Sequence, residues 1–161
     1  MREQFADVLN QLFTETYYNI GKYEETILKN AGKHNLSLND FHLIECIGNG
    51  GDNGRTVGEI AQNMNVTLPT VTVALNKLEK KNYVTKNKIA EDGRVVYIKL
   101  TRQGQKMNTA HRYFHKNMIR IIGNKFTDDE LEILIRCMKT LNNIFIIGSE
   151  QADEKEVTEG L

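Results

Sequence analysis

Six side chains between Thr67 and Asn76 are of types that can read the edges of DNA base pairs. A threonine hydroxyl donates to or accepts from bases and phosphates, its methyl group suits the thymine methyl, and asparagine pairs bidentately with adenine. No arginine lies in this segment, so strong recognition of guanine is missing. The segment therefore predicts an A·T-rich site in which DNA shape adds specificity. The six residues are Thr67, Leu68, Thr70, Thr72, Val73 and Asn76.

A basic region follows this segment. Residues 77–120 hold twelve lysines and arginines and three acidic side chains, a net charge of +9, although the whole chain is formally neutral. A neutral protein with one strongly basic third has a localised anion-binding face, and we expect the charges around the predicted hairpin to contact phosphate. The further candidate DNA contacts are Lys77, Lys86, Lys88, Asp92, Gly93 and Arg94.

Arg94 follows the turn sequence Asp92-Gly93. At a hairpin tip an arginine can enter a narrow minor groove, where the negative potential is enhanced, and Asp92 can pair with it. The alternative interpretation is a surface hairpin with an incidental arginine.

Histidine and cysteine offer other chemistry, with less support. His111 and His115 are four residues apart, a spacing that suits metal ligands on a helix. The sequence shows no cysteine or acidic cluster beside them, so we assign no metal and no cofactor, and a metal sensor is an alternative. Cys46 and Cys137 lie in apolar helical patterns, which predict buried structural thiols.

Sequence signatures of an enzyme are missing. The segment Gly48–Gly54 is rich in glycine, but a phosphate cradle needs a preceding strand and a following Lys-Ser/Thr, and neither is predicted. The chain shows no order of residues typical of a catalytic triad and no nucleotide fingerprint. We therefore predict a binding protein and not an enzyme.

The elements that position the DNA-contacting residues form a helix–turn–helix and a hairpin. A capping box at Thr56 and Glu59 begins a short helix, and Thr67 with Pro69 begins a longer one that runs to about Lys81. Residues 83–89 and 95–100 then read as two strands. This order predicts a winged helix–turn–helix whose second helix enters the major groove.

Long helices are predicted on both sides of this region. Apolar residues recur at helical spacing over residues 2–31, Ser37 and Asp40 suggest a capping box, and helices follow Thr101 and Thr127. We expect one compact, mainly α domain with a small β-hairpin wing. Its parts are an N-terminal dimerisation helix (1–36), the winged helix–turn–helix (37–100), C-terminal dimerisation helices (101–148) and a disordered acidic tail (149–161).

The apolar stripes of the first and last helices exceed what one small core needs. Since two-fold DNA sites call for dimers, we expect an intertwined two-fold homodimer on an A·T-rich pseudo-palindrome. The alternative is that these helices fold back on their own domain. No run of apolar residues is long enough to span a membrane, and we expect a cytoplasmic protein. The predicted dimer contacts are Phe5, Leu9, Leu12, Phe13, Leu131, Leu134, Ile135, Met138, Leu141 and Phe145.

With these residues in place, the chain up to about residue 148 resembles the MarR family of transcriptional regulators. The likeness rests on the order of elements and on the segments Thr67–Lys81, Asp92-Gly93-Arg94 and Leu100-Thr101-x-x-Gly104. The family's wing usually has a charged residue between its Asp and Arg, where this chain has Gly93. The resemblance implies a DNA-binding regulator that works as a homodimer.

Within the family the chain looks most like the fatty-acid biosynthesis repressors of Firmicutes, through residues 66–84, the wing and His111–Met118. That likeness implies repression of type II fatty-acid synthesis genes, tuned by acyl-carrier protein that carries a long acyl chain. The alternative is a regulator that responds to a metal ion, a phenolic small molecule or thiol oxidation. The candidate lining of an acyl pocket is Phe41, Ile44, Phe114 and Met118, for which core packing is the alternative role.

Overall fold

The computed structural model describes residues 2–30, 35–88 and 96–159, without the side chains of residues 2–4, 28–30, 88 and 149–159. The chain forms two compact units, Met1–Lys116 and Asn117–Leu161, which we call the N-terminal unit and the C-terminal unit. Helix α5 begins in the first unit and ends in the second. The elements are α1 (Arg2–Asn30), α2 (Leu38–Gly48), the 3₁₀ helix η1 (Gly51–Asn53), β1 (Arg55–Thr56), α3 (Val57–Met64), α4 (Leu68–Lys80), β2 (Val84–Lys88), β3 (Val96–Leu100), α5 (Arg102–Gly123) and α6 (Asp128–Glu159).

The predicted helix starts are confirmed by the capping geometry. Ser37 accepts from the backbone N–H of Asp40, whose carboxylate accepts from the N–H of Ser37, and Thr56 and Glu59 form the same reciprocal pair. Thr67 accepts from the N–H of Thr70 at the start of α4. The hydrogen bonds from Thr56 hold the pKa of the Glu59 carboxyl below its usual value. These caps fix the starts of the helices that carry the site, because each satisfies backbone N–H groups that the helix leaves unpaired.

Strand β1, before α3, and strands β2 and β3, after α4, form a three-stranded antiparallel sheet of order β1-β3-β2. In the predicted hairpin, Val84 pairs with Leu100 and Lys88 with Val96. The sequence did not predict β1, whose two residues pair with Ile98 and Tyr97 of β3. A two-residue strand has too little alternation to be seen in a sequence, and it forms because β3 offers a free edge.

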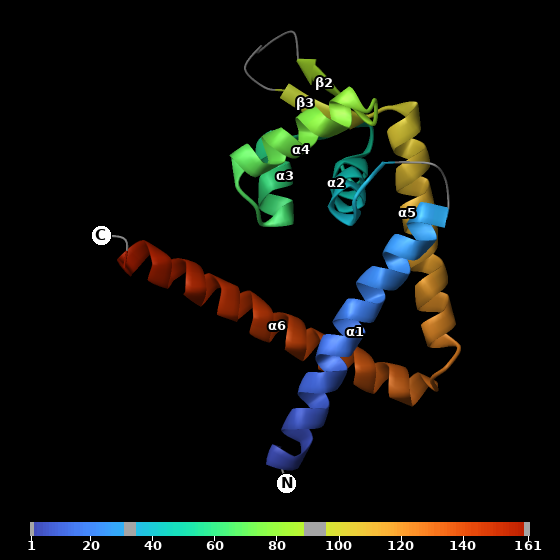
Figure 1. Ribbon diagram of the computed structural model, residues 1–161, viewed down its shortest axis with the longest axis vertical. Coiled ribbons are helices and arrows are strands. Elements are labelled where there is room, and N and C mark those ends of the chain that lie inside the picture. Colours follow the sequence, from blue (N-terminus) through green and yellow to red (C-terminus); the bar gives the residue numbers. More distant parts are fainter. Residues whose placement is uncertain (1, 31–34, 89–95, 160–161) are drawn as a thin grey trace. The chain divides into compact units, whose positions relative to one another are not determined.

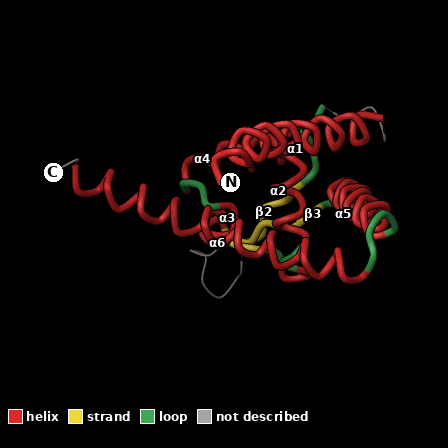
Figure 2. Tube along the Cα trace, turned by 90° about the horizontal axis from the view of Figure 1, so that it is seen from below, coloured by secondary structure: helices red, strands yellow, loops and turns green. Residues whose placement is uncertain are grey.

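The core of the N-terminal unit lies where α2, α3 and α4 meet the sheet. Helix α2 lies between α3 and α5 in both views of the chain (Figures 1 and 2). Thirteen buried apolar side chains form one cluster, and they come from α2, α3, α4, the strands and the segments beside them. Helix α4 contributes one face to this core, through Val71, Leu75 and Leu78.

The junction between β3 and α5 explains the motif Leu100-Thr101-x-x-Gly104. Thr101 donates its hydroxyl to the carbonyl of Asn82, at 2.7 Å, and accepts from the N–H of Gly104, at 3.1 Å. A Cβ atom at Gly104 would collide with the carbonyl oxygen of Tyr83. Glycine is therefore required where α5 begins, because the backbone that enters β2 passes so close.

The C-terminal unit contains the end of α5 and the helix α6. Thr127 and Glu130 form the predicted capping box, with hydrogen bonds of 2.8 and 3.4 Å. Helix α6 runs to Glu159, which differs from the predicted end at residue 148 and the predicted disordered tail. Residues 149–159 contain no glycine or proline and hold four glutamates with one each of Ala, Gln and Lys, which favour helix and outweigh the acidic composition on which that prediction rested.

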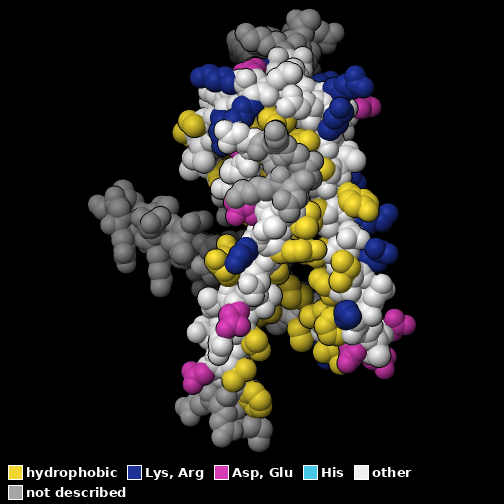
Figure 3. Space-filling model, turned by 45° about the vertical axis from the view of Figure 1, so that its right-hand side comes forward, with side chains coloured by type: hydrophobic (Ala, Val, Ile, Leu, Met, Phe, Trp, Pro, Cys, Tyr) yellow, Lys and Arg dark blue, Asp and Glu magenta, His cyan; other side chains and the backbone are white. Residues whose placement is uncertain are grey.

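Helices α1 and α6 each expose large apolar side chains within the single chain. On α1 these include Phe5, Leu9, Leu12 and Phe13, with between 41% and 64% of each side chain accessible. Figure 3 shows hydrophobic side chains at the surface along this helix. On α6 Leu134, Ile135, Met138 and Phe145 are exposed, and Leu131 and Leu141 are half-buried. Among the described helices, none combines the length and hydropathy that a membrane-spanning segment needs.

Candidate nucleic-acid interface and histidine cluster

The outer face of α4 presents the six residues that the sequence singled out. Leu68 and Val73 are 53% and 69% exposed, whereas Val71 and Leu75 on the opposite face are buried. A left-handed turn at Asn65, with φ of 51°, separates α3 from α4. The structure therefore has the geometry of a helix–turn–helix, with its second helix open to a partner. The exposed residues are Thr67, Leu68, Thr70, Thr72, Val73 and Asn76.

The three threonines among these residues already form side-chain hydrogen bonds in the free protein. The hydroxyls of Thr67 and Thr70 are 2.8 Å apart, and Thr72 donates its hydroxyl to the carbonyl of Leu68, also at 2.8 Å. A hydroxyl that donates to the helix backbone keeps its lone pairs as acceptors and holds its methyl group in one orientation. Thr72 is therefore preset to accept from a base or to contact a thymine methyl.

Lys86 of β2 ties the sheet to α4. Its Nζ atom donates to the side-chain oxygen of Asn76 at 2.6 Å and pairs with Glu79 at 2.7 Å. The predicted contact of Lys86 with phosphate stays a prediction, and in the free protein its Nζ atom already has these partners. The Asn76 oxygen is also occupied, so bidentate pairing with adenine requires this contact to open.

Lys77 also has a partner within the protein. Its Nζ atom lies 2.7 and 3.0 Å from the carboxylate oxygens of Asp40, which is buried at the start of α2. Burial raises the pKa of the Asp40 carboxyl, but hydrogen bonds from Lys77 and Ser37 outweigh it and hold the pKa below its usual value. In the free protein Lys77 thus forms a bridge that fastens α4 to α2, and its contact with DNA stays a prediction.

The predicted wing tip, Asp92, Gly93 and Arg94, lies outside the described residues. The strands that lead to it are paired as predicted, and Lys88 ends β2 opposite Val96. The role of Arg94 in the minor groove stays a prediction.

The four residues suggested for an acyl pocket do not share one environment. Phe41 and Ile44 belong to the packed core, with 2% and 0% of their surface exposed. Phe114 packs against Tyr23 of α1, with ring centroids 5.5 Å apart, and Met118 belongs to the C-terminal unit. Phe41 and Ile44 therefore have the alternative role, core packing.

Three histidines and one glutamate meet inside the N-terminal unit. His111 of α5 is fully buried, and its Nε2 atom is 2.5 Å from Oε1 of Glu24 on α1. The same oxygen is 3.5 Å from Nε2 of His115 and 3.5 Å from Nε2 of His42 on α2. The two α5 histidines are 3.2 Å apart, Nε2 to Nε2. We call Glu24, His42, His111 and His115 the histidine cluster.

The sequence showed only the spacing of His111 and His115. It could not show that α1 and α2 place an acidic residue and a third histidine beside them, 87 residues away along the chain in the case of Glu24. The fourth histidine, His34, lies outside the described residues. No acidic residue is visible beside the two histidines in the sequence, which argued against a metal site. The structure places the carboxylate of Glu24 there.

The distances within the histidine cluster suit a metal ion. Two ligand atoms each about 2.1 Å from a tetrahedral Zn²⁺ lie about 3.4 Å apart. Two histidine nitrogens lie 3.5 Å from the Glu24 oxygen and the two α5 histidines are 3.2 Å apart, whereas the direct contact between Glu24 and His111 must lengthen to admit an ion. One oxygen of Glu24, Nε2 of His111 and one ring nitrogen of His115 lie within 4.8 Å of one another. His42 is partly exposed and borders a cleft on each side, which gives an ion access.

The prediction that both cysteines are buried is wrong. Cys137 is exposed on α6, and Cys46 is half-buried beside the cleft that His42 borders. Burial raises the pKa of the Cys46 thiol, which disfavours the reactive thiolate. A thiol-sensing role therefore gains no support from Cys46.

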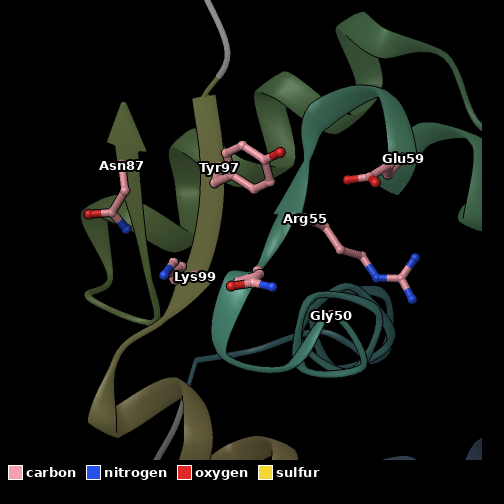
Figure 4. Close-up of a pocket in the computed structure, with 8 residues that line it drawn as sticks. Gly50, Arg55, Glu59, Asn87, Tyr97 and Lys99 are labelled. Atoms are coloured by element: carbon pink, nitrogen blue, oxygen red, sulfur yellow. The ribbon is translucent and has the colours of Figure 1, made fainter. Parts of the chain in front are cut away.

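A further cleft, which is polar, lies beside the sheet. Arg55 of β1, Glu59 of α3, Asn87 of β2, and Tyr97 and Lys99 of β3 surround it (Figure 4). Glu59 is engaged in the capping box with Thr56. The remaining side chains carry hydrogen-bonding groups and positive charge.

The fold and the exposed α4 face define a winged-helix DNA-binding protein. The sequence model of the MarR family matches residues 36–96. Two curated relatives are transcriptional regulators: YhjH of Bacillus subtilis, 25% identical over 78% of this chain and 73% of its own length, and ZitR of Lactococcus lactis, 27% identical over 56% and 64%. A crystal structure of Streptococcus pneumoniae FabT in complex with DNA has a TM-score of 0.81 and 28% identity, over 86% of this chain and 96% of that one.

Residues 36–96 thus match the MarR family, and the relatives named here are described as transcriptional regulators. The resemblance drawn from the sequence is confirmed at this level.

Proposed function

We propose that the protein is a homodimeric repressor that binds A·T-rich pseudo-palindromic DNA and whose affinity for DNA is set by a transition-metal ion such as Zn²⁺. The observation that carries the metal input is that His42, His111 and His115 approach one carboxylate oxygen of Glu24, and that the ligand atoms of Glu24, His111 and His115 all lie within 4.8 Å of one another. Three imidazoles and one carboxylate form a donor set typical of Zn²⁺ sites.

DNA binding is supported by the exposed outer face of α4 and by the similarity to FabT in complex with DNA. The side chains on that face favour A·T pairs, since it carries threonine, leucine, valine and asparagine without arginine. A regulator that contacts phosphates loses affinity steeply as salt rises. Selection of duplexes from a random pool, followed by titration at several salt concentrations, tests this part. A flat salt dependence without sequence preference would overturn it.

The homodimer is supported by the apolar side chains that α1 and α6 expose in the single chain. Phe5, Leu9 and Leu12 lie one helical turn apart on α1, as do Leu134, Met138 and Leu141 on α6. Exposed apolar surface of this extent marks an interaction site, and a pseudo-palindrome needs two readers. Sedimentation of the protein, alone and with Leu134→Asp and Leu141→Asp, tests the assignment. A dimer that survives both changes contradicts this interface.

The metal input has a direct test. The purified protein, freed of metal with a chelator, is titrated with Zn²⁺ against a coloured competitor, and DNA affinity is measured with and without the ion. We expect one ion per chain and a change in DNA affinity of roughly 5- to 150-fold, the usual range of coupling between two sites. Saturable binding without any change in DNA affinity would leave a structural metal and refute the input.

Acyl-carrier protein with a long acyl chain is the second candidate input. It is favoured by the resemblance to fatty-acid biosynthesis repressors, which the similarity to FabT supports. The core packing of Phe41 and Ile44 weighs against the pocket suggested for it. Addition of long-chain acyl-carrier protein to the metal-free protein on selected DNA separates the two inputs. A shift in affinity with this ligand, and none with Zn²⁺, would favour the second.

A further inference from the structure

His111 has a carboxylate at each of its two ring nitrogens. Its Nε2 atom contacts Glu24, whereas its Nδ1 atom lies 3.0 Å from Oε2 of Glu45 on α2. The ring is fully buried between Phe41 and His115, with centroid distances of 5.7 and 4.5 Å. Glu45 is therefore a fifth polar residue at the histidine cluster, on the side away from Glu24.

A neutral imidazole presents a lone pair at one nitrogen and an N–H group at the other. When a histidine binds a metal, its second nitrogen usually donates to a carboxylate or carbonyl, which fixes the tautomer and the orientation of the ring. We propose that Glu45 is this partner, so that it holds the Nδ1–H group of His111 and directs the Nε2 lone pair to the ion. This inference rests on the metal input proposed above.

The direction of the required movement supports this role. At present the Nδ1 atom of His111 lies within ion-pair distance of Glu45 but is not aligned for a hydrogen bond. An ion placed between Glu24 and His111 must lengthen their 2.5 Å contact, and whatever part of this change the ring takes up moves it away from Glu24, toward Glu45. Metal binding thus brings Nδ1–H onto the Glu45 carboxylate.

Glu45 is a positioning residue and not a ligand. Its carboxylate oxygen approaches the nitrogen that points away from Glu24, whereas the ion must lie at the other nitrogen. Glu45 is also three residues after His42 on α2, so one helix face supplies both a ligand and the support for another ligand. Without Glu45 the buried Nδ1–H group has no acceptor among the described residues, which disfavours the tautomer that binds metal.

The test compares metal affinities of full-length variants. Co²⁺, which reports its coordination by visible absorption, and Zn²⁺ are titrated into wild type, Glu45→Ala, Glu45→Gln and the control Glu132→Ala, which removes an exposed carboxylate from α6. We expect Glu45→Ala to weaken Zn²⁺ binding by roughly 10- to 100-fold. Glu45→Gln keeps an acceptor oxygen and should lose less, while Glu132→Ala should match wild type.

The Co²⁺ spectrum separates positioning from ligation. If Glu45 only orients His111, the saturated spectra of wild type and both Glu45 variants agree, although the affinities differ. A changed spectrum in Glu45→Ala would make Glu45 a ligand, and an unchanged affinity would show that it has no role, so either result overturns the inference. If wild type itself does not bind Co²⁺ or Zn²⁺, the proposed metal input fails instead. The Gln variant keeps the test decisive even if the Ala variant does not fold.

Discussion

The outer face of α4 and the histidine cluster are built in opposite ways. The α4 face comes from one continuous segment, with a cap at Thr67 and a core stripe at Val71, Leu75 and Leu78 that leaves the polar face outside. The histidine cluster comes from three helices and joins residues 24 and 111 at 2.5 Å. The first site is exposed and locally determined, while the second is centred on the buried Glu24 and His111 and depends on tertiary packing.

This difference teaches where a sequence is informative. Local signals such as caps, turns and alternation act over a few residues, so they can be read from one chain. A buried polar group must find its partner somewhere in the fold. The sequence shows that His111 needs a partner if it is buried, but not that α1 brings Glu24 to it. We therefore expect the two sites to fail separately when each is mutated.

The largest expected effect is on the histidine cluster. Replacing Glu24 with Ala removes the oxygen that lies nearest to all three histidines, and we expect Zn²⁺ affinity to fall by more than about 100-fold. Binding of the metal-free variant to DNA should match that of metal-free wild type. Competition titration and DNA binding on the same samples check both statements, with Glu15→Ala on the exposed surface of α1 as the control.

The next effect concerns the predicted wing. Arg94→Ala should weaken DNA binding by about 1–3 kcal/mol if the guanidinium enters the minor groove, and it should leave Zn²⁺ affinity unchanged. Arg102→Ala, an exposed arginine at the start of α5, is the matched control. Equal DNA affinities for the two variants would contradict a special role of Arg94.

Lys77 of α4 contacts Asp40 of α2, the helix that also carries His42. Its replacement therefore tests whether the outer face of α4 and the histidine cluster are independent. In Lys77→Met the buried Asp40 carboxylate loses its charged partner, although the lysine is itself nearly half exposed. We expect a loss of about 1–2 kcal/mol in the free energy of unfolding, because solvent screens part of the pair. Chemical denaturation measures this loss. Lys80→Met, one helical turn after Lys77 on α4, is the control and should stay within about 0.5 kcal/mol of wild type.

Lys77→Met should also weaken DNA binding, because the bridge to α2 sets the position of α4. If its DNA affinity equals that of wild type while stability falls, the bridge serves folding only. If DNA affinity falls and stability does not, Lys77 contacts DNA as the sequence predicted.

The winged helix–turn–helix could be predicted almost completely from residues 56–100. The Thr56 and Thr67 caps, the left-handed turn before α4 and the strands β2 and β3 all follow from local chemistry. What could not be predicted was β1, which forms only against the edge of β3, and the partners of Lys77 and Lys86. A lysine reads as a free cation in a sequence until the fold places a carboxylate beside it.

The smallest expected effect is on sequence preference. Thr72→Ala removes a hydroxyl that donates to the carbonyl of Leu68 and removes the methyl group that it orients. We expect a loss of about 1 kcal/mol on the preferred duplex and less on duplexes with G·C replacements, since only the base contact is specific. Titration of both duplexes against wild type measures this difference. Thr109→Ala, a threonine with the same bond to the carbonyl four residues earlier on α5, controls for helix effects. An equal loss on every duplex would mean that Thr72 contacts only phosphate, and the exposed face of α4 would then position the protein without reading the sequence.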